Sequence, residues 1–579
     1  MKKVFKHLKP YTLAIIVSVM FTFIQAILSL YMPNLMSDIV NNGIVGKSMD
    51  NVWEYGKKMI LVTLISMVSA VISTFIASKV SSGFAKRLRG AVYEKVQKFS
   101  IKEFNKISTS SLITRTTNDV TQVQQLTLMA MRLMILAPLM CVGGIIMSVS
   151  ENKELSIIFT IVIPLLIIII ALLARFIVPL FTKLQTLTDR INQVVREKLT
   201  GVRVIRAFGN QDYEAKRYDK ASKDIYDVSL KAGYIMSTLM PMIFFIINVT
   251  SAAIIWFGAK QIDAGTLEIG SMMAFMQYAM QVLFSILMVT MIFVLIPRSI
   301  VSAKRINEVL EIEPSIIDNE NEKVEISKHG EIEFNNVEFR YDEHSDPVLD
   351  NISFRINKGE TLAIIGGTGS GKSTILNLIL RFYDTTKGEV KVGGINVKDL
   401  SLTQLRDMIG YVPQKVNLFS GTIAENIRYG KEDATEEDIV EASKIAQAYD
   451  FISSLDEGFD SMVSQGGTNY SGGQKQRLSI ARAIVKKPEI YIFDDSFSAL
   501  DYATDRKLRE ALNSNIKDST FIIVAQRVST VLNADKILFI DEGKIIAQGT
   551  HKELFKSCEE YREVVLSQIT EEEATESGK

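Results

Sequence analysis

A glycine-rich run that ends in lysine, serine and threonine is the part of this sequence best suited to chemistry. It reads LAIIGGTGSGKST and fits the pattern G-x-x-x-x-G-K-[ST]. Glycines let consecutive backbone N–H groups turn toward phosphate oxygens, while the lysine suits β- and γ-phosphates and the serine hydroxyl suits Mg²⁺. The run therefore predicts a site for ATP and Mg²⁺. Its nucleotide-binding residues are expected to be Gly366, Gly367, Thr368, Gly369, Ser370, Gly371, Lys372, Ser373 and Thr374.

Two adjacent carboxylates further along could serve the same site. Asp494 and Asp495 directly follow the apolar residues IYIF. A carboxylate at the end of a buried strand can reach an ion beside the phosphates, so Asp494 is expected to bind Mg²⁺, through a water molecule. The alternative is an acidic pair in a solvated turn. The glycine-rich run upstream favours the metal role.

These residues need a sheet that brings them to one edge. The alternation in EIEFNNVEF predicts a half-buried strand, and the runs TLAII, IYIF and FIIVA predict buried central strands. Helical stretches lie between these runs, which is typical of an α/β domain. We expect this domain, a P-loop ATPase, over residues 331–565.

The first half of the chain predicts a membrane domain over residues 1–311. A helix needs about 20 apolar residues to cross a bilayer. The stretches that meet this length are 12–32, 59–79, 127–149, 155–179, 236–258 and 272–297. The long segments after the second and fourth stretches are rich in lysine and arginine, which favours the cytosol for both. We therefore expect six helical spans, with both termini and the ATPase domain in the cytosol.

Polar segments connect and end these domains. Apolar residues recur at three and four positions from Ala85 to Phe99, which predicts a helix that continues past the membrane. A turn near 104–111 could then contact the ATPase domain and couple it to the spans. Residues 312–330 are expected to form the interdomain linker and residues 566–579 an acidic tail, whose last residues, TEEEATESGK, are expected to be disordered.

A nine-residue segment, NYSGGQKQR at 469–477, resembles the signature of the ATP-binding cassette (ABC) family, and the whole chain resembles its exporters. The resemblance implies that the Tyr341 ring stacks on adenine and that Gln414, in YVPQ, approaches Mg²⁺ and the attacking water. It also implies a dimer in which each ATP lies between one P-loop and the other chain's signature. The signature residues expected to act on the partner's ATP are Ser471, Gly472, Gly473 and Gln474.

Two residues depart from the family pattern at the catalytic site. Asp495 occupies the position where the family usually has a glutamate as general base, and Gln526 the position of its histidine. Aspartate is one methylene shorter, and glutamine cannot become a cation. With Gln414, these residues form the predicted catalytic set. We expect this chain's ATP site to hydrolyse slowly and the chain to work as an obligate heterodimer; neutral drift and a homodimer are the alternatives.

The cargo is less well defined by the residues. Methionines such as Met272, Met276 and Met280 in the sixth stretch are soft side chains that can repack around varied apolar ligands. This favours export of a small amphipathic or drug-like compound, with lipid or peptide as the alternatives. An ATP-gated channel or a sensor without net transport stays open. The fused domain order disfavours an importer.

Composition and the membrane stretches exclude several other classes. The 579 residues contain 65 basic and 65 acidic side chains, so net charge indicates no partner, and the two cysteines exclude a disulfide framework. Soluble P-loop ATPases that clamp DNA are excluded by the six spans, and we expect no nucleic-acid partner. The expected location is the lipid bilayer of the cell membrane, in bacteria the cytoplasmic membrane.

Overall fold

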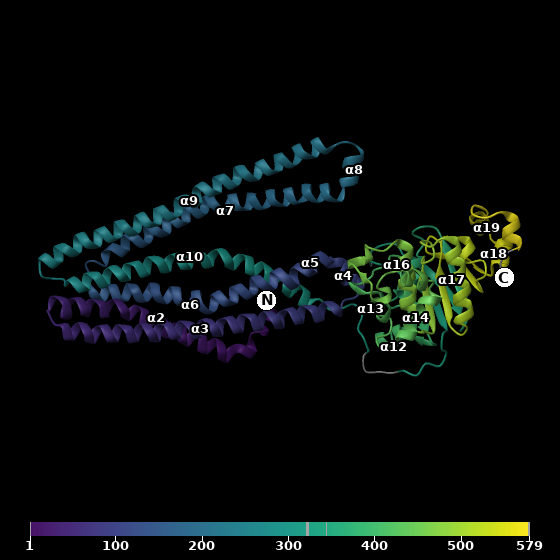
Figure 1. The fold of residues 1–579 in the computed structure, drawn as a ribbon, viewed down its shortest axis with the longest axis horizontal. Helices are drawn as coiled ribbons and strands as arrows, with labels where there is room; N and C mark the ends of the chain where they lie inside the picture. Colours follow the sequence, from purple (N-terminus) through teal and green to yellow (C-terminus); the bar gives the residue numbers. More distant parts are fainter. Residues whose placement is uncertain (1, 320–323, 343, 577–579) are drawn as a thin grey trace. The chain divides into compact units, whose positions relative to one another are not determined.

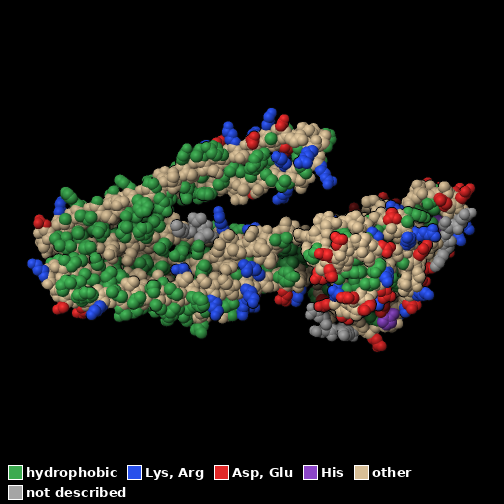
Figure 2. Space-filling model, viewed as in Figure 1, with side chains coloured by type: hydrophobic (Ala, Val, Ile, Leu, Met, Phe, Trp, Pro, Cys, Tyr) green, Lys and Arg blue, Asp and Glu red, His purple; other side chains and the backbone are tan. Residues whose placement is uncertain are grey.

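The computed structural model describes residues 2–319, 324–342 and 344–576. The chain forms two compact units, one made of Met1–Gln97 with Thr109–Ile312 and the other of Lys98–Ser108 with Glu313–Lys579. Part of the predicted linker, residues 320–323, and the last three residues of the predicted tail lie outside the described residues. Figure 2 shows hydrophobic side chains covering much of the visible face of the long helices, as expected for surfaces that meet lipid.

Within the described residues, six helices are long and apolar enough to cross a membrane, which confirms the six predicted spans. They continue well beyond the predicted apolar stretches at their polar ends. These helices are α2 (Thr12–Asp38), α3 (Met49–Gln97), α6 (Val120–Glu151), α7 (Ile157–Thr200), α9 (Gln211–Asp263) and α10 (Ile269–Glu311). The shorter helical segments of this unit are α1 (Lys2–Lys6), η1 (Lys9–Tyr11), η2 (Ile39–Val45), α5 (Thr109–Thr114), η3 (Arg115–Asp119) and α8 (Val202–Ala207).

Small and hydroxyl side chains hold the first two spans together. The Ser73 hydroxyl lies 2.6 Å from that of Thr22 and 3.3 Å from that of Ser18, and all three side chains are buried. Small residues let helix backbones approach closely. This packing matters in lipid, because the hydrophobic effect does not drive helices together there. α7 and α9 run side by side as a second pair, joined by α8 (Figure 1).

The second unit is built on two larger sheets and a two-stranded ribbon. Its antiparallel sheet has the order β2 (Leu349–Ile356), β1 (Ile332–Phe339), β4 (Lys387–Val392), β5 (Ile395–Asn396). The six-stranded sheet has the order β12 (Lys544–Gly549), β11 (Lys536–Asp541), β3 (Thr361–Gly366), β10 (Thr520–Val524), β9 (Ile490–Asp494), β6 (Ile409–Val412). β7 (Gly421–Thr422) and β8 (Met462–Val463) form the ribbon. The predicted central strands TLAII, IYIF and FIIVA are β3, β9 and β10, which confirms the α/β class.

Helices surround these sheets. They are α11 (Lys372–Ile379), α12 (Leu402–Asp407), α13 (Ile423–Arg428), α14 (Glu436–Ile445), α15 (Tyr449–Ser453), α16 (Gly472–Ile484), α17 (Tyr502–Asn515), α18 (His551–Ser557), α19 (Glu559–Leu566) and α20 (Glu571–Glu576). Single turns occur at η4 (Gly458–Asp460), η5 (Gln465–Gly467) and η6 (Val528–Thr530).

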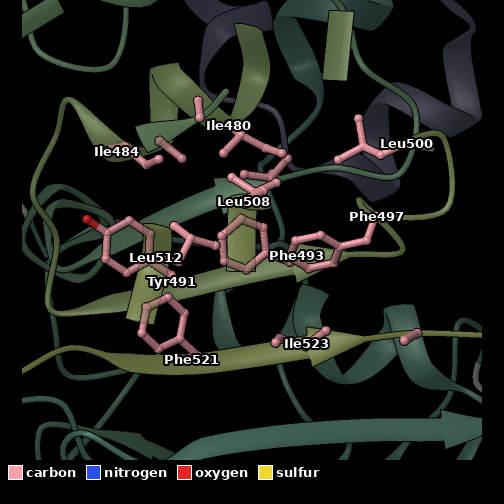
Figure 3. Close-up of a cluster of buried hydrophobic side chains, with 14 of the residues drawn as sticks. Ile480, Ile484, Tyr491, Phe493, Phe497, Leu500, Leu508, Leu512, Phe521 and Ile523 are labelled. Carbon is pink, nitrogen blue, oxygen red and sulfur yellow. The ribbon is translucent and has the colours of Figure 1, made fainter. Parts of the chain in front are cut away.

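β9 is buried on both faces, and this burial positions the two carboxylates at its end. Tyr491 and Phe493 point into one hydrophobic cluster, while Ile490 and Ile492 point into the other. The Phe493 ring centroid lies 5.1 Å from that of Phe497 (Figure 3). Parallel strands inside a sheet have apolar side chains on both faces, and each face of β9 packs into its own cluster.

A short helix from between α3 and α5 belongs to the ATPase unit. α4 (Ile101–Ile107) begins with a capping box in which Ser100 and Glu103 exchange hydrogen bonds. The predicted contact segment 104–111 is therefore divided, since residues 104–108 belong to this unit and residues 109–111 to the membrane unit.

The predicted disorder of the acidic tail is wrong for residues 571–576, which form α20. Thr570 caps this helix, because its hydroxyl oxygen accepts from the Glu573 N–H at 3.3 Å, while its own N–H donates to the Glu573 carboxylate at 3.0 Å. Acidic side chains in the first turn suit the positive end of a helix. Ala574 is buried, and its carbonyl oxygen lies 3.0 Å from His551 Nε2. The capping bonds and this contact outweigh the polar composition.

Replacing Phe493 with alanine should destabilise the ATPase unit strongly. The ring is fully buried, and losing a buried phenyl group costs about 3–5 kcal/mol. In a thermal melt of the purified protein, we expect the midpoint of the ATPase unit to fall by at least about 6 °C. Ile546→Ala, at a side chain that is 48% exposed, is the matched control and should shift it far less. Equal midpoints would contradict the packing described for β9.

Candidate functional site

The glycine-rich loop joins β3 to α11 in a backbone shape that only glycine accepts. Gly369 and Gly371 have φ angles of 85° and 99°, in the left-handed region. A Cβ at Gly371 would lie 2.6 Å from Leu349 Cδ2, and a Cβ at Gly366 would clash with the carbonyl oxygen of Ile540. The loop can therefore curl closely and leave its N–H groups for an anion at the start of α11.

Lys372 places its positive charge inside this curl. Its Nζ donates to the carbonyl oxygens of Gly366 at 2.9 Å and Gly367 at 2.6 Å. Burial lowers the pKa of the Lys372 ammonium, and the carboxylates of Asp495 and Asp494 oppose that shift. A phosphate beside the ammonium would act in the same direction as these carboxylates, since a negative charge favours the protonated form.

Ser373 and Asp494 meet across the sheet edge. The Ser373 hydroxyl donates to Asp494 Oδ1 at 3.2 Å, and Asp494 is buried. Burial raises the pKa of Asp494, while the hydrogen bond from Ser373 lowers it. Hydroxyl and carboxylate oxygens are the donors that Mg²⁺ prefers, and a cation would offset the burial of the charge. This pair fits the predicted magnesium role.

Two of the predicted catalytic residues, Gln414 and Gln526, form hydrogen bonds with one carboxylate oxygen of the third, Asp495. Gln414 Nε2 donates to Asp495 Oδ2 at 3.2 Å, and Gln526 Nε2 donates to the same oxygen at 3.0 Å. Asp495 has a φ of 48°, and its backbone N–H donates to the carbonyl oxygen of Val524 at 2.9 Å. Because Gln414 follows β6 and Gln526 follows β10, the strands on either side of β9 deliver both amides to the end of β9.

A cavity of about 580 Å³ lies over this edge of the sheet. The predicted residues that line it are Gly366, Gly367, Thr368, Gly369, Lys372, Ser373, Gln414, Asp494, Asp495 and Gln526. Asp541 and four C-terminal residues that the sequence did not predict also line it: Glu560, Glu563, Val564 and Gln568. No local motif marks these four, because they reach the cavity only through the packing of α19 and of the turn that follows it.

The remaining predicted P-loop residues and Tyr341 lie just outside this lining. Ser370 and Thr374 are buried beneath the loop. The Tyr341 hydroxyl lies 3.0 Å from Thr374 Oγ1, and its ring packs edge-on against Phe339 and Tyr383, at centroid distances of 4.9 and 5.2 Å. Tyr341 is 43% exposed, so part of the residue remains open to a flat base.

The signature segment forms the exposed start of α16. Ser471 is its N-cap, and its backbone N–H donates to Gln474 Oε1 at 2.9 Å. A Cβ built on Gly472 would have no heavy atom of the described residues within 4 Å, while one on Gly473 would lie 3.3 Å from the Ala499 carbonyl oxygen. Among the described residues, none of the four signature residues lines the cavity. The P-loop and the signature of one chain are therefore separate surfaces.

Comparisons with known proteins agree with this arrangement. Residues 15–287 match the family described as ABC transporter transmembrane region, and residues 349–498 match the family described as ABC transporter. An uncharacterized ABC transporter ATP-binding protein of Mycobacterium tuberculosis is 38% identical over 567 residues, with 97% of each chain covered. An ATP-dependent lipid A-core flippase of Syntrophus aciditrophicus is 33% identical over 512 residues, with 88% of this chain and 84% of the flippase covered.

A solved structure has the same fold. It is that of a bacterial Atm1-family ABC exporter with ATP bound, with a TM-score of 0.79, 23% identity, and coverage of 97% of this chain and 99% of that one. Together with the glycine-rich loop, the strand-end carboxylates and the six long helices, these matches show that the chain belongs to the ABC transporter family, as a half-unit with the transmembrane region and the ATPase region in one polypeptide.

Proposed function

We propose that this half-unit of an ATP-driven exporter works with a second half-transporter and that its own ATP site hydrolyses slowly. The exposed start of α16, away from the cavity of the same chain, carries this proposal. Because the signature segment does not line the cavity over the P-loop of its own chain, it is available to contact the ATP of a partner chain. ATP bound between the two chains then draws the ATPase domains together.

The P-loop and the strand-end carboxylate bind the nucleotide in this proposal. The loop N–H groups and Lys372 hold the phosphates, and the Tyr341 ring stacks on adenine. Ser373, Asp494 and Gln414 would hold Mg²⁺. When bound, Mg²⁺ neutralises charge on the β- and γ-phosphate oxygens.

The contacts of Asp495 support slow hydrolysis at this site. A general base must come within about 2.6–3.2 Å of the attacking water. The Asp495 carboxylate is one methylene shorter than glutamate, and both Gln414 and Gln526 already donate to its Oδ2. Gln526 stays neutral, so it adds no positive charge beside the γ-phosphate. The partner's site, completed by the intact signature Ser471–Gln474, carries most of the hydrolysis in this proposal.

Two classes of cargo remain candidates. Met272 and Met276 pack against a hydrophobic cluster between the helices, and Met280 packs against another, so these methionines give less support to a substrate pocket than their composition suggested. Small amphipathic compounds suit a cavity in a membrane. Lipid is the second candidate, because a relative with 33% identity is a lipid A-core flippase.

Coupling between ATP and the membrane helices is proposed to pass through α4. Glu103 Oε2 accepts from the Ser100 hydroxyl at 2.6 Å and the Ser100 N–H at 2.8 Å, and the Ser100 hydroxyl lies 2.8 Å from that of Ser315 in the linker. Burial opposes ionisation, but hydrogen bonds from Ser100 and Ser315 outweigh it and lower the pKa of Glu103. One buried carboxylate therefore joins the α3–α5 connection to the linker.

Vesicles that contain the assembled transporter should accumulate an amphipathic fluorescent dye against its gradient when MgATP is added outside. Lys372→Ala in this chain, combined with loss of the partner's P-loop lysine, should abolish the accumulation. Fluorescence of the dye gives the readout, and a labelled phospholipid tests the second cargo class. ATP-dependent flux only down the gradient would indicate a channel and contradict the exporter proposal.

The double variant Asp495→Glu with Gln526→His should raise ATP turnover at this chain's site by at least about tenfold, because it restores a longer base and a side chain that can carry charge. The chain is expressed without a partner, and phosphate release is measured at saturating MgATP. Lys372→Ala gives the background rate. Brisk turnover by the unmodified chain, equal to that of the double variant, would refute slow hydrolysis.

Glu103→Ala should separate ATP hydrolysis from transport. Without the carboxylate, α4 loses the hydrogen bonds that Glu103 accepts from Ser100 and Ser315, so we expect dye transport per ATP hydrolysed to fall by about tenfold while basal hydrolysis stays within about twofold. The exposed Lys106, on the same helix, is the control position, and Lys106→Ala should leave both rates unchanged. If Glu103→Ala transports with unchanged efficiency, this carboxylate has no coupling role.

A further inference from the structure

Gln568, in the C-terminal segment, forms hydrogen bonds with the backbone on both sides of Arg527. Gln568 Nε2 donates to the carbonyl oxygen of Gln526 at 3.0 Å, and Gln568 Oε1 accepts from the N–H of Val528 at 2.9 Å. Both ends of the amide are used, and both partners are backbone groups. The contact therefore constrains the path of the chain at Gln526, whatever side chain occupies that position.

The segment that carries Gln568 is itself held firmly. The Gln568 N–H donates to the Val565 carbonyl oxygen at 3.0 Å, at the end of α19. Tyr561 of α19 is fully buried, and its hydroxyl lies 2.9 Å from His551 Nδ1. The other ring nitrogen of His551 lies 3.0 Å from the Ala574 carbonyl oxygen of α20. One buried imidazole thus ties α18, α19 and α20 together around the turn that presents Gln568.

The hydrogen bonds of Gln568 act on Gln526, whose side chain contacts Asp495. The Gln526 side chain donates to Asp495 Oδ2 at 3.0 Å, while its carbonyl oxygen accepts from Gln568. Gln568 also lines the cavity over the P-loop, together with Val564. A short path of hydrogen bonds therefore runs from the C-terminal segment through the backbone at Gln526 to the carboxylate at the end of β9.

We propose that Gln568 is a positioning residue for the ATP site: it sets the backbone at Gln526 and thereby aims the side chain at that position toward Asp495 and the γ-phosphate. The proposal rests on the proposed function of this site as an ATP site. It gives the C-terminal segment a part in nucleotide chemistry beyond closing the fold. Because Gln568 forms these hydrogen bonds with backbone atoms, they persist when Gln526 is replaced by histidine.

The first test needs no hydrolysis. Hydrogen exchange is measured by mass spectrometry on peptides that contain Val528, in the full chain. Gln568→Ala removes the acceptor of the Val528 N–H, so exchange there should rise by about tenfold or more. Gln568→Glu keeps that acceptor and should preserve the protection. Ser567→Ala is the matched control, because the Ser567 hydroxyl donates only locally, to the Val564 carbonyl oxygen at 2.7 Å.

The second test measures kinetics in the faster background of Asp495→Glu with Gln526→His. Adding Gln568→Ala should lower kcat by about tenfold and change the KM for ATP by less than about twofold, since the misplaced group acts on the reacting phosphate. Adding Gln568→Glu should restore part of kcat. Ser567→Ala should change neither parameter. General destabilisation would instead lower the active fraction without this dependence on the acceptor.

The outcomes separate the two proposals. Exchange at Val528 that is equal in Gln568→Ala and Ser567→Ala would overturn the positioning role, whatever the kinetics show. Faster exchange with kcat unchanged in the faster background would also overturn it. If the double variant itself gains no turnover, slow hydrolysis at this site is refuted, and the exchange measurement still decides whether Gln568 holds the backbone at Gln526.

Discussion

The nucleotide site depends on the burial of three neighbouring parallel strands, β3, β10 and β9. Their apolar side chains pack into hydrophobic clusters on both faces of the sheet, so a slip in pairing would disrupt both layers at once. Ile364 pairs with Val524, and Val524 pairs with Asp494, which brings the carboxyl ends of all three strands to one edge. The P-loop, the carboxylates and Gln526 meet there as a consequence of core packing.

Burial also sets the electrostatics of that edge. It lowers the pKa of Lys372 and raises the pKa of Asp494, so each charge is less favourable there than in water. An anion near the lysine and a cation near the carboxylate would reverse both tendencies. The same low-dielectric edge that penalises single charges therefore favours a phosphate together with a metal ion, which is the chemistry that ATP and Mg²⁺ supply.

The ATPase unit is completed by segments distant in sequence. α4 comes from between α3 and α5, and Glu103 ties it to Ser315 of the linker. At the other end of the chain, α19 supplies Glu560 and Glu563 to the wall of the cavity. The unit thus includes a piece of the connection between spans and a C-terminal segment that lines the cavity over the P-loop.

Local sequence patterns were enough to predict the membrane spans, the P-loop and the carboxylates of the candidate site. Six apolar stretches, the loop from Gly366 to Ser373 and the aspartates after IYIF are each recognisable within a few residues, because bilayer thickness, phosphate geometry and strand burial impose short patterns. Only tertiary structure decided that Gln414 and Gln526 share one oxygen of Asp495, that Gln568 holds the backbone at Gln526, and that His551 contacts the Ala574 carbonyl oxygen of α20. Those features rest on contacts between residues far apart in the chain, which no local periodicity records.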